Sequence, residues 1–498
     1  MSFLGEVISS IPIVLQPFNL LVTFIGVLVG ITFGAVPGIG APLAMTMFLP
    51  MAFGMDPIPC LLILLGLYFA ALYGGSISSI LINAPGTPAS IATSYDGYPM
   101  SQKGEAGIAL NTSVVSSMFG GFFSIIVFIL FFNPLNELFI EFGPSQLFVF
   151  VFISFVFLTM LDKTKWDKVI VATCVGLLLG MVGQDLISGS IRYTFGYIYI
   201  EDGLDLIAVL TAWFAVTEVL FLIGKKEGSI ATDGILKGSP LQGVKNCFKY
   251  PVTLIRSSII GCVVGIIPGV GGSVANVAAY SAAKSSSKHP ELFGTGYAEG
   301  VVAPEAANNA VSATSLIPTL ALGIPGSAPA AIILGALLML GYRPGPGLAS
   351  TDPGLIPALI AGMITVNILF CIVGLSLTNT YKKITQVNIK ILIPLIISLS
   401  LLGGYLSRFR ISDVFFALLL GVFAYGTRKA KYPVTPMVLG FLLATMIEEN
   451  FFKSLLISDN GALIFIQGPI NIFLVTVGIL IICWQPLKKF FSNITSSN

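Results

Sequence analysis

Neutral polar side chains recur at helical spacing inside two long apolar stretches of the sequence. The first set is Ser76, Ser79 and Asn83, and the second is Asn308, Asn309, Ser312 and Ser315. Residues three, four and seven positions apart share one face of a helix. Hydroxyls and amides on such a face can bind a carboxylate or a sodium ion without a buried charge. They also commonly form hydrogen bonds between membrane helices, and both interpretations stay open for each residue.

Each set leads into a Pro-Gly turn, and another Pro-Gly turn lies upstream of it. The four turns are Pro37-Gly38-Ile39-Gly40, Pro85-Gly86-Thr87, Pro268-Gly269-Val270-Gly271 and Pro325-Gly326-Ser327. Proline removes a backbone donor and glycine permits a positive φ, so these turns should end helices. A freed backbone group in lipid costs several kcal/mol unless it finds a partner. The turns are therefore predicted to be buried in protein or to line a water-filled cavity.

Interrupted helices at matching places along a membrane protein are typical of a transporter binding site. A half-helix that begins after a turn offers unpaired N–H groups and a positive dipole end to an anion, whereas bare carbonyls offer oxygen ligands to a cation. Pro42 is expected in the first turn of such a new helix. We expect Gly38 and Gly326 to need a positive φ and a close approach to the ligand.

The alternative is that the interruptions are kinks, or small residues that let helices pack closely. Packing faces are predicted for the Gly-x-x-x-Gly pairs that precede two of the turns, Gly30 with Gly34 and Gly261 with Gly265. We favour a binding site at the Pro-Gly turns themselves because both kinds of turn occur twice in the same order.

The positions of charged residues restrict how a ligand could be held. No arginine precedes Arg192 and no lysine precedes Lys103, so the first part of the chain must hold an anion with backbone dipoles and neutral donors. Five acids near the ends of apolar segments are expected to be interfacial and solvated, although an intramembrane carboxylate could carry protons instead. These acids are Glu218, Glu299, Glu305, Glu448 and Glu449.

The sequence gives little support to an enzyme. His289, the one histidine, lies in a polar stretch, which excludes a metal site of several imidazoles and makes an intramembrane Ser-His dyad improbable. The chain has no GxxxxGK[ST] phosphate loop, so it carries no ATPase of its own. We therefore expect no cofactor and no metal, apart from a sodium ion that could bind at the same turns.

The composition indicates an all-α polytopic membrane protein. Of the 498 residues, 55% are hydrophobic and 10% are charged, which is too little charge for the surface of a soluble protein of this size. The net charge of +2 does not suggest a nucleic-acid partner. We expect roughly 10–12 transmembrane helices with further re-entrant or broken ones. The stronger candidate spans are 11–34, 57–82, 106–132, 145–161, 204–224, 354–378, 388–404, 411–427 and 462–484, and the weaker ones are 41–53, 167–183, 251–267, 272–283, 303–323, 327–341 and 434–447.

A polar stretch divides the chain into two halves. Residues 225–249, "KKEGSIATDGILKGSPLQGVKNCFK", carry five lysines against two acids. Basic loops prefer the cytoplasm, so we place this stretch there, together with "TRKAKY" at 427–432. The predicted organisation is a first membrane half at 1–224, a cytoplasmic linker at 225–250 and a second membrane half at 251–498. Because both kinds of Pro-Gly turn occur once in each half, we predict an internal duplication, built as inverted repeats by analogy with other transporters.

Two long segments carry a resemblance to a known family. "YGGSISSILINAPGTPASIATSYDGYPMSQKGEAGIAL" (73–110) and "FGTGYAEGVVAPEAANNAVSATSLIPTLALGIPGSAPAAIILGAL" (293–337) are similar to the two signatures of the large membrane subunit of the tripartite tricarboxylate transporters. The resemblance covers nearly the whole chain and is weakest over 135–250 and after about residue 350.

The resemblance implies a secondary-active importer in a bacterial inner membrane. Such a subunit works with a small membrane subunit and with a periplasmic protein that delivers citrate or another di- or tricarboxylate. A sodium or proton gradient drives uptake. The central site would be formed by the four turns and by "AANN" at 306–309. A channel for small organic anions is the alternative, since channels also use broken helices and rings of carbonyls.

Overall fold

The computed structural model describes residues 3–161, 166–185, 187–223, 240–377, 380 and 389–480. Residues 224–239, most of the predicted linker, lie outside this range, and the division at that linker stays a prediction. Contacts group the chain into two compact units, which are described separately. Unit 1 comprises residues 1–136 and 207–425, and unit 2 comprises residues 137–206 and 426–498.

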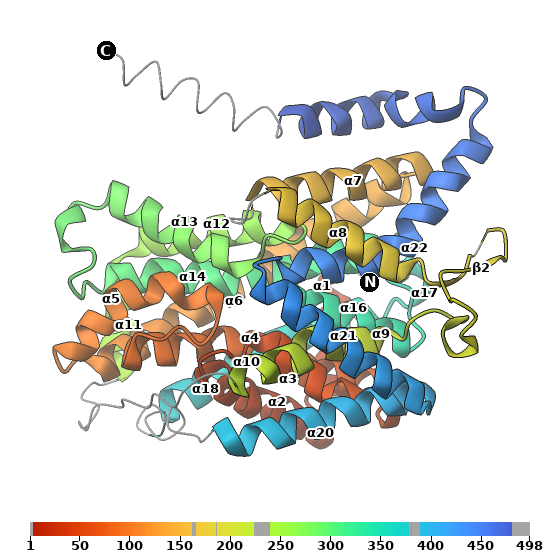
Figure 1. The fold of residues 1–498 in the computed structure, drawn as a ribbon. Helices are drawn as coiled ribbons and strands as arrows, with labels where there is room; N and C mark the ends of the chain where they lie inside the picture. Colours follow the sequence, from red (N-terminus) through yellow and green to blue (C-terminus); the bar gives the residue numbers. More distant parts are fainter. Residues whose placement is uncertain are drawn as a thin grey trace, which may run out of the picture. The chain divides into compact units, whose positions relative to one another are not determined.

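Unit 1 is a bundle of helices with several short interruptions (Figure 1). Its first part contains α1 (Phe3–Val14), α2 (Pro17–Ala35), α3 (Ala41–Phe48), η1 (Leu49–Gly54), α4 (Pro57–Ile82), η2 (Pro88–Ser90), α5 (Ile91–Gln102) and α6 (Ala106–Ile140), which continues into unit 2. Its second part contains α9 (Leu206–Leu210), the π-helical turn η4 (Thr211–Val216), α10 (Thr217–Ile223), α11 (Pro240–Lys249), α12 (Pro251–Ile266), α13 (Gly271–Ser286), η5 (Pro290–Leu292), α14 (Glu299–Thr314), α15 (Leu316–Leu322), α16 (Ala328–Met339), α17 (Leu348–Thr351), α18 (Leu355–Ser376), α20 (Ile389–Arg408) and α21 (Ile411–Lys429).

The described part of unit 2 combines three longer helices and a shorter one at Pro469–Leu480 with a small hairpin. Its elements are α7 (Pro144–Leu161), α8 (Trp166–Gly180), β1 (Gly183–Gln184), β2 (Ile191–Arg192), η3 (Ile198–Ile200), α22 (Val434–Ile457) and η6 (Gly461–Ile466). The two strands pair antiparallel, with Gly183 opposite Arg192. In Figure 1, α7 and α8 in gold lie beside the first part of α22 in blue.

The expectation of an all-α polytopic membrane protein is confirmed. Seven described helices are long and apolar enough to cross a membrane, or up to eight if the bent pair α11–α12 forms one span. Six further apolar helices are shorter. The weaker segments of the sequence analysis fall mainly among the short and broken helices, because prolines and glycines interrupt them.

The predicted helix breaks occur at all four Pro-Gly turns. α2 ends at Ala35 and α3 begins at Ala41, with Pro42 in its first turn as expected. α12 ends at Ile266 and α13 begins at Gly271. The later turns separate α4 from η2 and α15 from α16. The left-handed caps Asn83 (φ 53°) and Gly323 (φ 72°) end the helices before the later turns.

Small residues let the helices before the first turns approach their neighbours closely. A Cβ atom at Gly34 would lie 2.4 Å from the Ala71 carbonyl oxygen of α4, and one at Gly30 would lie 2.8 Å from that of Leu67. In the later sequence, a Cβ at Gly261 would lie 2.3 Å from the Ala307 carbonyl oxygen of α14. The predicted packing faces are thereby confirmed: α2 packs on α4, and α12 packs on α14.

Candidate functional site

The first two turns meet in the interior of unit 1. Gly86 fits between α2 and α4, since a Cβ there would lie 2.1 Å from the Gly34 carbonyl oxygen and 2.8 Å from the Gly75 Cα. Its N–H donates to the Gly75 carbonyl oxygen at 3.1 Å. The Thr87 methyl group lies 3.7 Å from the Cβ position of Gly40. The turn at 85–87 is therefore held against the turn at 37–40.

The later two turns meet in the same way. A Cβ at Gly326 would lie 2.7 Å from the Ser315 carbonyl oxygen and 2.9 Å from that of Gly265. The Gly269 N–H donates to the Gly326 carbonyl oxygen at 3.0 Å, and the Gly326 N–H donates to Thr319 Oγ1 at 3.3 Å. Gly86 and Gly326 thus share close backbone contacts but differ in their hydrogen-bond acceptors, and the internal duplication stays a prediction.

Glycine is needed at these turns for two different physical reasons. Gly38, Gly269 and Gly271 have φ values of 94°, 79° and 68°, which L side chains rarely adopt. Gly326 does not have a positive φ, so that expectation is wrong for it. Instead the neighbouring backbone comes too close to leave room for a side chain, as it does at Gly86.

Side chains from α4 and α14 join the two sets of turns. The Tyr68 hydroxyl shares hydrogen bonds with Ser315 Oγ at 3.0 Å and with Ser327 Oγ at 3.2 Å. The side-chain amide groups of Asn308 and Asn309 donate to the carbonyl oxygens of Leu72 and Phe69 at 3.3 and 3.4 Å. The polar faces predicted from the sequence thus lie against one another across the two halves.

The side-chain oxygens of both asparagines have no hydrogen-bond partner among the described residues. Asn308 Oδ1 and Asn309 Oδ1 are buried and accept no hydrogen bond within the described part of the chain. Their orientation is fixed, because the other atom of each amide must donate to a backbone carbonyl. Asn308 Oδ1 lies 2.7 Å from the position a Cβ would take on Gly272, the residue that directly follows the turn at 268–271. A buried amide oxygen can accept a hydrogen bond from a ligand or coordinate a hard cation.

The expectation that Glu305 is solvated at an interface is wrong. It is fully buried, not solvated at an interface. Its Oε1 accepts from Ser76 Oγ and Thr93 Oγ1, both at 2.5 Å, and its Oε2 accepts from Ser113 Oγ and Ser117 Oγ, both at 2.8 Å. The helical spacing of Ser113 and Ser117 is a sequence signal that could have pointed to a polar partner for α6.

Of the other four acids expected at an interface, two are buried and two are partly exposed. Glu299 and Glu218 are buried, and Glu299 accepts hydrogen bonds from Thr253 Oγ1 at 2.5 Å and Ser287 Oγ at 2.8 Å. Glu448 and Glu449 are only partly buried, and both form ion pairs. Burial follows from packing between helices that are distant along the chain, which residue spacing does not show.

A second buried carboxylate, Asp96 of α5, holds the connection between α13 and α14. Its Oδ1 accepts from the backbone N–H groups of Gly294, Gly296 and Tyr297 at 2.8–2.9 Å. Its Oδ2 accepts from the Tyr280 hydroxyl at 2.8 Å. This carboxylate therefore fixes the polar loop that is inserted in the second half.

The remaining predicted residues take several positions. Ser79 is buried and donates to Ser90 Oγ at 2.9 Å, whereas Asn83 caps α4 and is exposed. Pro268, Pro325 and Ser327 are buried, and Pro37 and Pro85 are half-buried. All four turns are followed by the start of a helix, whose first N–H groups lack intrahelical partners. Among the described residues, no three His, Cys, Asp or Glu side chains are grouped to hold a metal ion.

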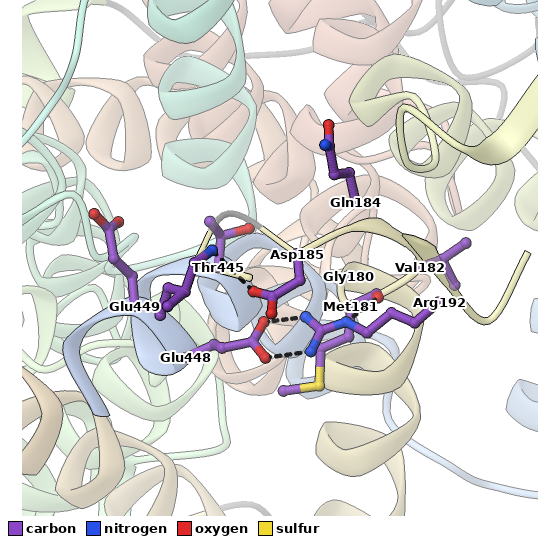
Figure 2. A pocket seen from close by; sticks show the side chains of 10 residues that line it. Gly180, Met181, Val182, Gln184, Asp185, Arg192, Thr445, Glu448 and Glu449 are labelled. Atoms are coloured by element: carbon purple, nitrogen blue, oxygen red, sulfur yellow. Dashed lines mark hydrogen bonds and ion pairs between the residues drawn. The ribbon is translucent and has the colours of Figure 1, made fainter. Parts of the chain in front are cut away.

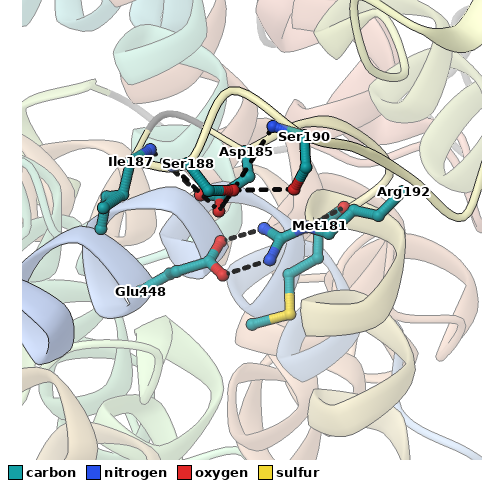
Figure 3. Close-up of polar contacts among 7 residues, drawn as sticks. All are labelled: Met181, Asp185, Ile187, Ser188, Ser190, Arg192 and Glu448. Atoms are coloured by element: carbon teal, nitrogen blue, oxygen red, sulfur yellow. Dashed lines mark hydrogen bonds and ion pairs between the residues drawn. The ribbon is translucent and has the colours of Figure 1, made fainter.

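Unit 2 contains a separate hollow beside its hairpin (Figure 2). Arg192 at its edge is already paired with Glu448: Nη1 donates to Oε1 at 2.6 Å and Nη2 donates to Oε2. Its Nε donates to the Met181 carbonyl oxygen at 3.3 Å (Figure 3). The hollow measures about 30 Å³, enough for a few water molecules but far below the several hundred Å³ of a typical ligand pocket. It is not a site for an organic acid.

Comparison with known proteins identifies one matching family and two similar relatives. The family model described as "Tripartite tricarboxylate transporter TctA family" matches residues 20–439. An Agrobacterium vitis protein described as an uncharacterized 52.8 kDa protein in the TAR-I ttuC′ 3′ region is 35% identical over 466 residues, covering 93% of this chain and 92% of the relative. A second A. vitis protein, from the TAR-II ttuC′ 3′ region, is 35% identical over 233 residues, covering 47% of this chain and 96% of the relative. No solved structure matches the chain.

Proposed function

Because the chain belongs to the tripartite tricarboxylate transporter TctA family, we propose that it is the large permease subunit of a binding-protein-dependent secondary transporter. The family is one of transporters rather than enzymes, so the chain is a membrane component of tricarboxylate transport. The proposal goes further in four respects. The cargo is a di- or tricarboxylate, the mechanism is alternating access, the driving force is a sodium or proton gradient, and the location is a bacterial inner membrane.

The observation that carries the proposal is the junction of the four broken segments in unit 1. A helix starts after every turn, and the first N–H groups of a helix, which have no intrahelical partner, can bind a carboxylate. At α16 the Ala330 N–H already donates to Ser327 Oγ at 3.3 Å. Asn308 Oδ1 and Asn309 Oδ1 provide unpaired oxygens that suit a sodium ion or a ligand hydroxyl. Neutral donors are sufficient because a dry, preorganised site strengthens each of these electrostatic interactions.

Counterflow in proteoliposomes tests the transport mechanism. Vesicles preloaded with unlabelled citrate should accumulate external labelled citrate above its equilibrium level, because a carrier exchanges its cargo across the membrane. A channel would only equilibrate the label, so flat equilibration would replace the carrier proposal by the channel alternative. Parallel vesicles with an imposed sodium gradient or an imposed pH gradient identify the coupling ion.

The proposed partners are a small membrane subunit and a periplasmic substrate-binding protein. Support comes from the tripartite character of the family. Co-purification from a membrane extract, with the small subunit tagged, should recover this chain in a stable complex. Uptake from dilute substrate should in addition require the purified binding protein. Full uptake by this chain alone, at substrate levels far below its own affinity, would contradict this assembly.

A further inference from the structure

An exposed aromatic loop follows the hairpin of unit 2. Residues 193–199, "YTFGYIY", follow β2 and include the first two residues of η3, and they are called the aromatic loop here. Phe195 at its tip is 90% exposed, and Tyr197 is 65% exposed. Tyr193, Ile198 and Tyr199 are each more than half exposed as well. So many large apolar side chains on one short irregular segment mark an interaction surface.

The backbone holds this loop in an unusual shape. Tyr193 and Phe195 have φ values of 58° and 51°, a left-handed conformation that is rare for bulky residues. Strained conformations of this kind persist only where the surroundings fix them, and they cluster at functional sites. Within the loop, the Tyr197 N–H donates to the Thr194 carbonyl oxygen at 2.9 Å, and Thr194 itself is buried.

The hairpin anchors the base of the aromatic loop. The Arg192 guanidinium binds both carboxylate oxygens of Glu448 on α22. At the hairpin turn, Asp185 accepts from the backbone N–H of Ile187 at 3.1 Å and from the Ser188 hydroxyl (Figure 3). These hydrogen bonds lower the pKa of Asp185, with the Ser188 hydroxyl making the largest contribution. The loop is therefore presented from a fixed platform.

Contacts within unit 2 place the aromatic loop on the side opposite to the basic segment 427–432. Lys168 at the start of α8 donates to the Ala430 carbonyl oxygen at 2.5 Å and lies over the Tyr432 ring. α8 and α22 then run in the same direction, since Gly176 packs on Met437 and Gly180 on Ala444. Glu448 is about 21 Å further along α22 than Val434, the first residue of that helix, at 1.5 Å per residue. If the basic end is cytoplasmic, the aromatic loop faces the other compartment.

The charge around the loop favours a protein partner over a lipid surface. Residues 181–205 contain four acids, Asp185, Glu201, Asp202 and Asp205, against the single Arg192. Membrane-surface segments bind anionic lipid headgroups through lysine and arginine, so a net negative segment suits them poorly. Exposed tyrosines and phenylalanine next to acids are instead complementary to an apolar pocket rimmed by basic residues on a protein.

We propose that the aromatic loop is the docking surface for a soluble, extracytoplasmic protein whose docking face has an apolar pocket with a Lys/Arg rim. This inference rests on the proposed function, in which that partner is the periplasmic substrate-binding protein. Phe195 and Tyr197 fill the pocket, and the three acids of residues 181–205 that are not buried, Asp185, Glu201 and Asp202, attract its rim before contact.

Uptake driven by the purified binding protein tests the proposal. Proteoliposomes containing the membrane subunits receive increasing amounts of substrate-loaded binding protein. In the variants Phe195→Asn and Tyr197→Asn, the half-saturating concentration of binding protein should rise at least about tenfold, as for a central aromatic at an interface. Asparagine tolerates the left-handed conformation at 195, so the loop keeps its shape. The matched control is Trp166→Asn, since Trp166 is 65% exposed on the same unit but at the other end of α8.

Counterflow of free citrate, measured on the same vesicles, separates the two proposals. The docking surface is supported if both variants show unchanged counterflow of free citrate together with a tenfold rise in the half-saturating concentration of binding protein. An unchanged half-saturating concentration in both variants overturns it while leaving the carrier proposal intact, and no counterflow in the parent protein overturns the carrier proposal instead.

Photocrosslinking gives a second readout that does not depend on variant activity. A benzophenone amino acid at position 195 should crosslink to the added binding protein, and raising the salt concentration should reduce the yield. Crosslinks to lipid or to the small membrane subunit alone would overturn the proposal.

Discussion

Ser76 of α4 donates its hydroxyl hydrogen to Oε1 of Glu305 in α14, with 2.5 Å between the oxygens. The serine belongs to the first half of the chain and the glutamate to the second. Thr93, Ser113 and Ser117 complete the shell of this buried carboxylate. Four hydroxyls from three helices thus converge on one acid beside the broken segments.

We expect the Glu305 shell to be a main determinant of stability. Glu305→Ala leaves four hydroxyls without their acceptor and opens a cavity, so it should lower the free energy of unfolding by about 3–5 kcal/mol. Glu305→Gln keeps the volume and an acceptor oxygen, so its effect should be about 1–3 kcal/mol. Thermal unfolding in detergent measures both. Glu291→Ala, at an exposed acid, is the control and should leave the midpoint unchanged. Equal midpoints for Glu305→Ala and the parent would show that the shell contributes nothing.

We expect that neither Gly86 nor Gly326 can be replaced by a residue with a side chain, because the neighbouring backbone leaves no room for one. Gly86→Ala and Gly326→Ala place a Cβ within 2.1 and 2.7 Å of a backbone oxygen, so the turns must move apart and uptake should be lost. Gly404→Ala is the matched control, because nothing lies within 4 Å of its Cβ position in α20. Uptake by the three variants, normalised to protein in the membrane, checks this. Normal uptake by both turn variants would remove the turns from the site.

Asn308 and Asn309 should matter for binding more than for stability. Their replacement by alanine removes the unpaired oxygens, and we expect substrate or cation binding to weaken about tenfold. Asn367→Ala is a matched control: its amide donates to the Met118 carbonyl oxygen at 2.8 Å, and its Oδ1 is also buried with no hydrogen-bond partner among the described residues, but it lies on α18. Binding isotherms in detergent distinguish the three. If Asn367→Ala weakens binding as much as the other two, the asparagines act through general packing.

Asp96 should control the order of the loop between α13 and α14. The Gly294 N–H also donates to Asp96 Oδ2, at 3.0 Å. Asp96→Asn replaces one carboxylate oxygen by an amide nitrogen, which cannot accept such a bond, so residues 290–297 should exchange amide hydrogens at least about tenfold faster. Lys103→Ala is the comparison, because its ammonium also binds this loop, at the Thr295 carbonyl oxygen, but from an exposed position. Hydrogen exchange with mass spectrometry reports on both variants. Protection that is equal in Asp96→Asn and the parent would contradict this role.

The helix ends, the helix-packing glycines and the membrane environment could be predicted from the sequence. Pro37, Pro268 and their glycines end helices because of their own covalent geometry, wherever the rest of the chain lies. Gly34 and Gly261 could be recognised as packing positions because small residues at four-residue spacing leave a groove on a helix. The low content of charged residues also indicated a membrane protein from the sequence alone, because a surface with so little charge is suited to lipid and not to water.

Only the tertiary structure decided which groups meet. Glu305 is near a segment end in the sequence, yet α4, α5 and α6 enclose it and supply all four of its hydroxyl partners. Gly326 needs no unusual φ, and a backbone from another helix restricts it instead. Such facts depend on distances between residues that are not neighbours in the sequence, as Ser76 and Glu305 are separated by 229 positions. Spacing along one helix specifies the face on which a side chain lies, but the packing of other helices determines what that face touches.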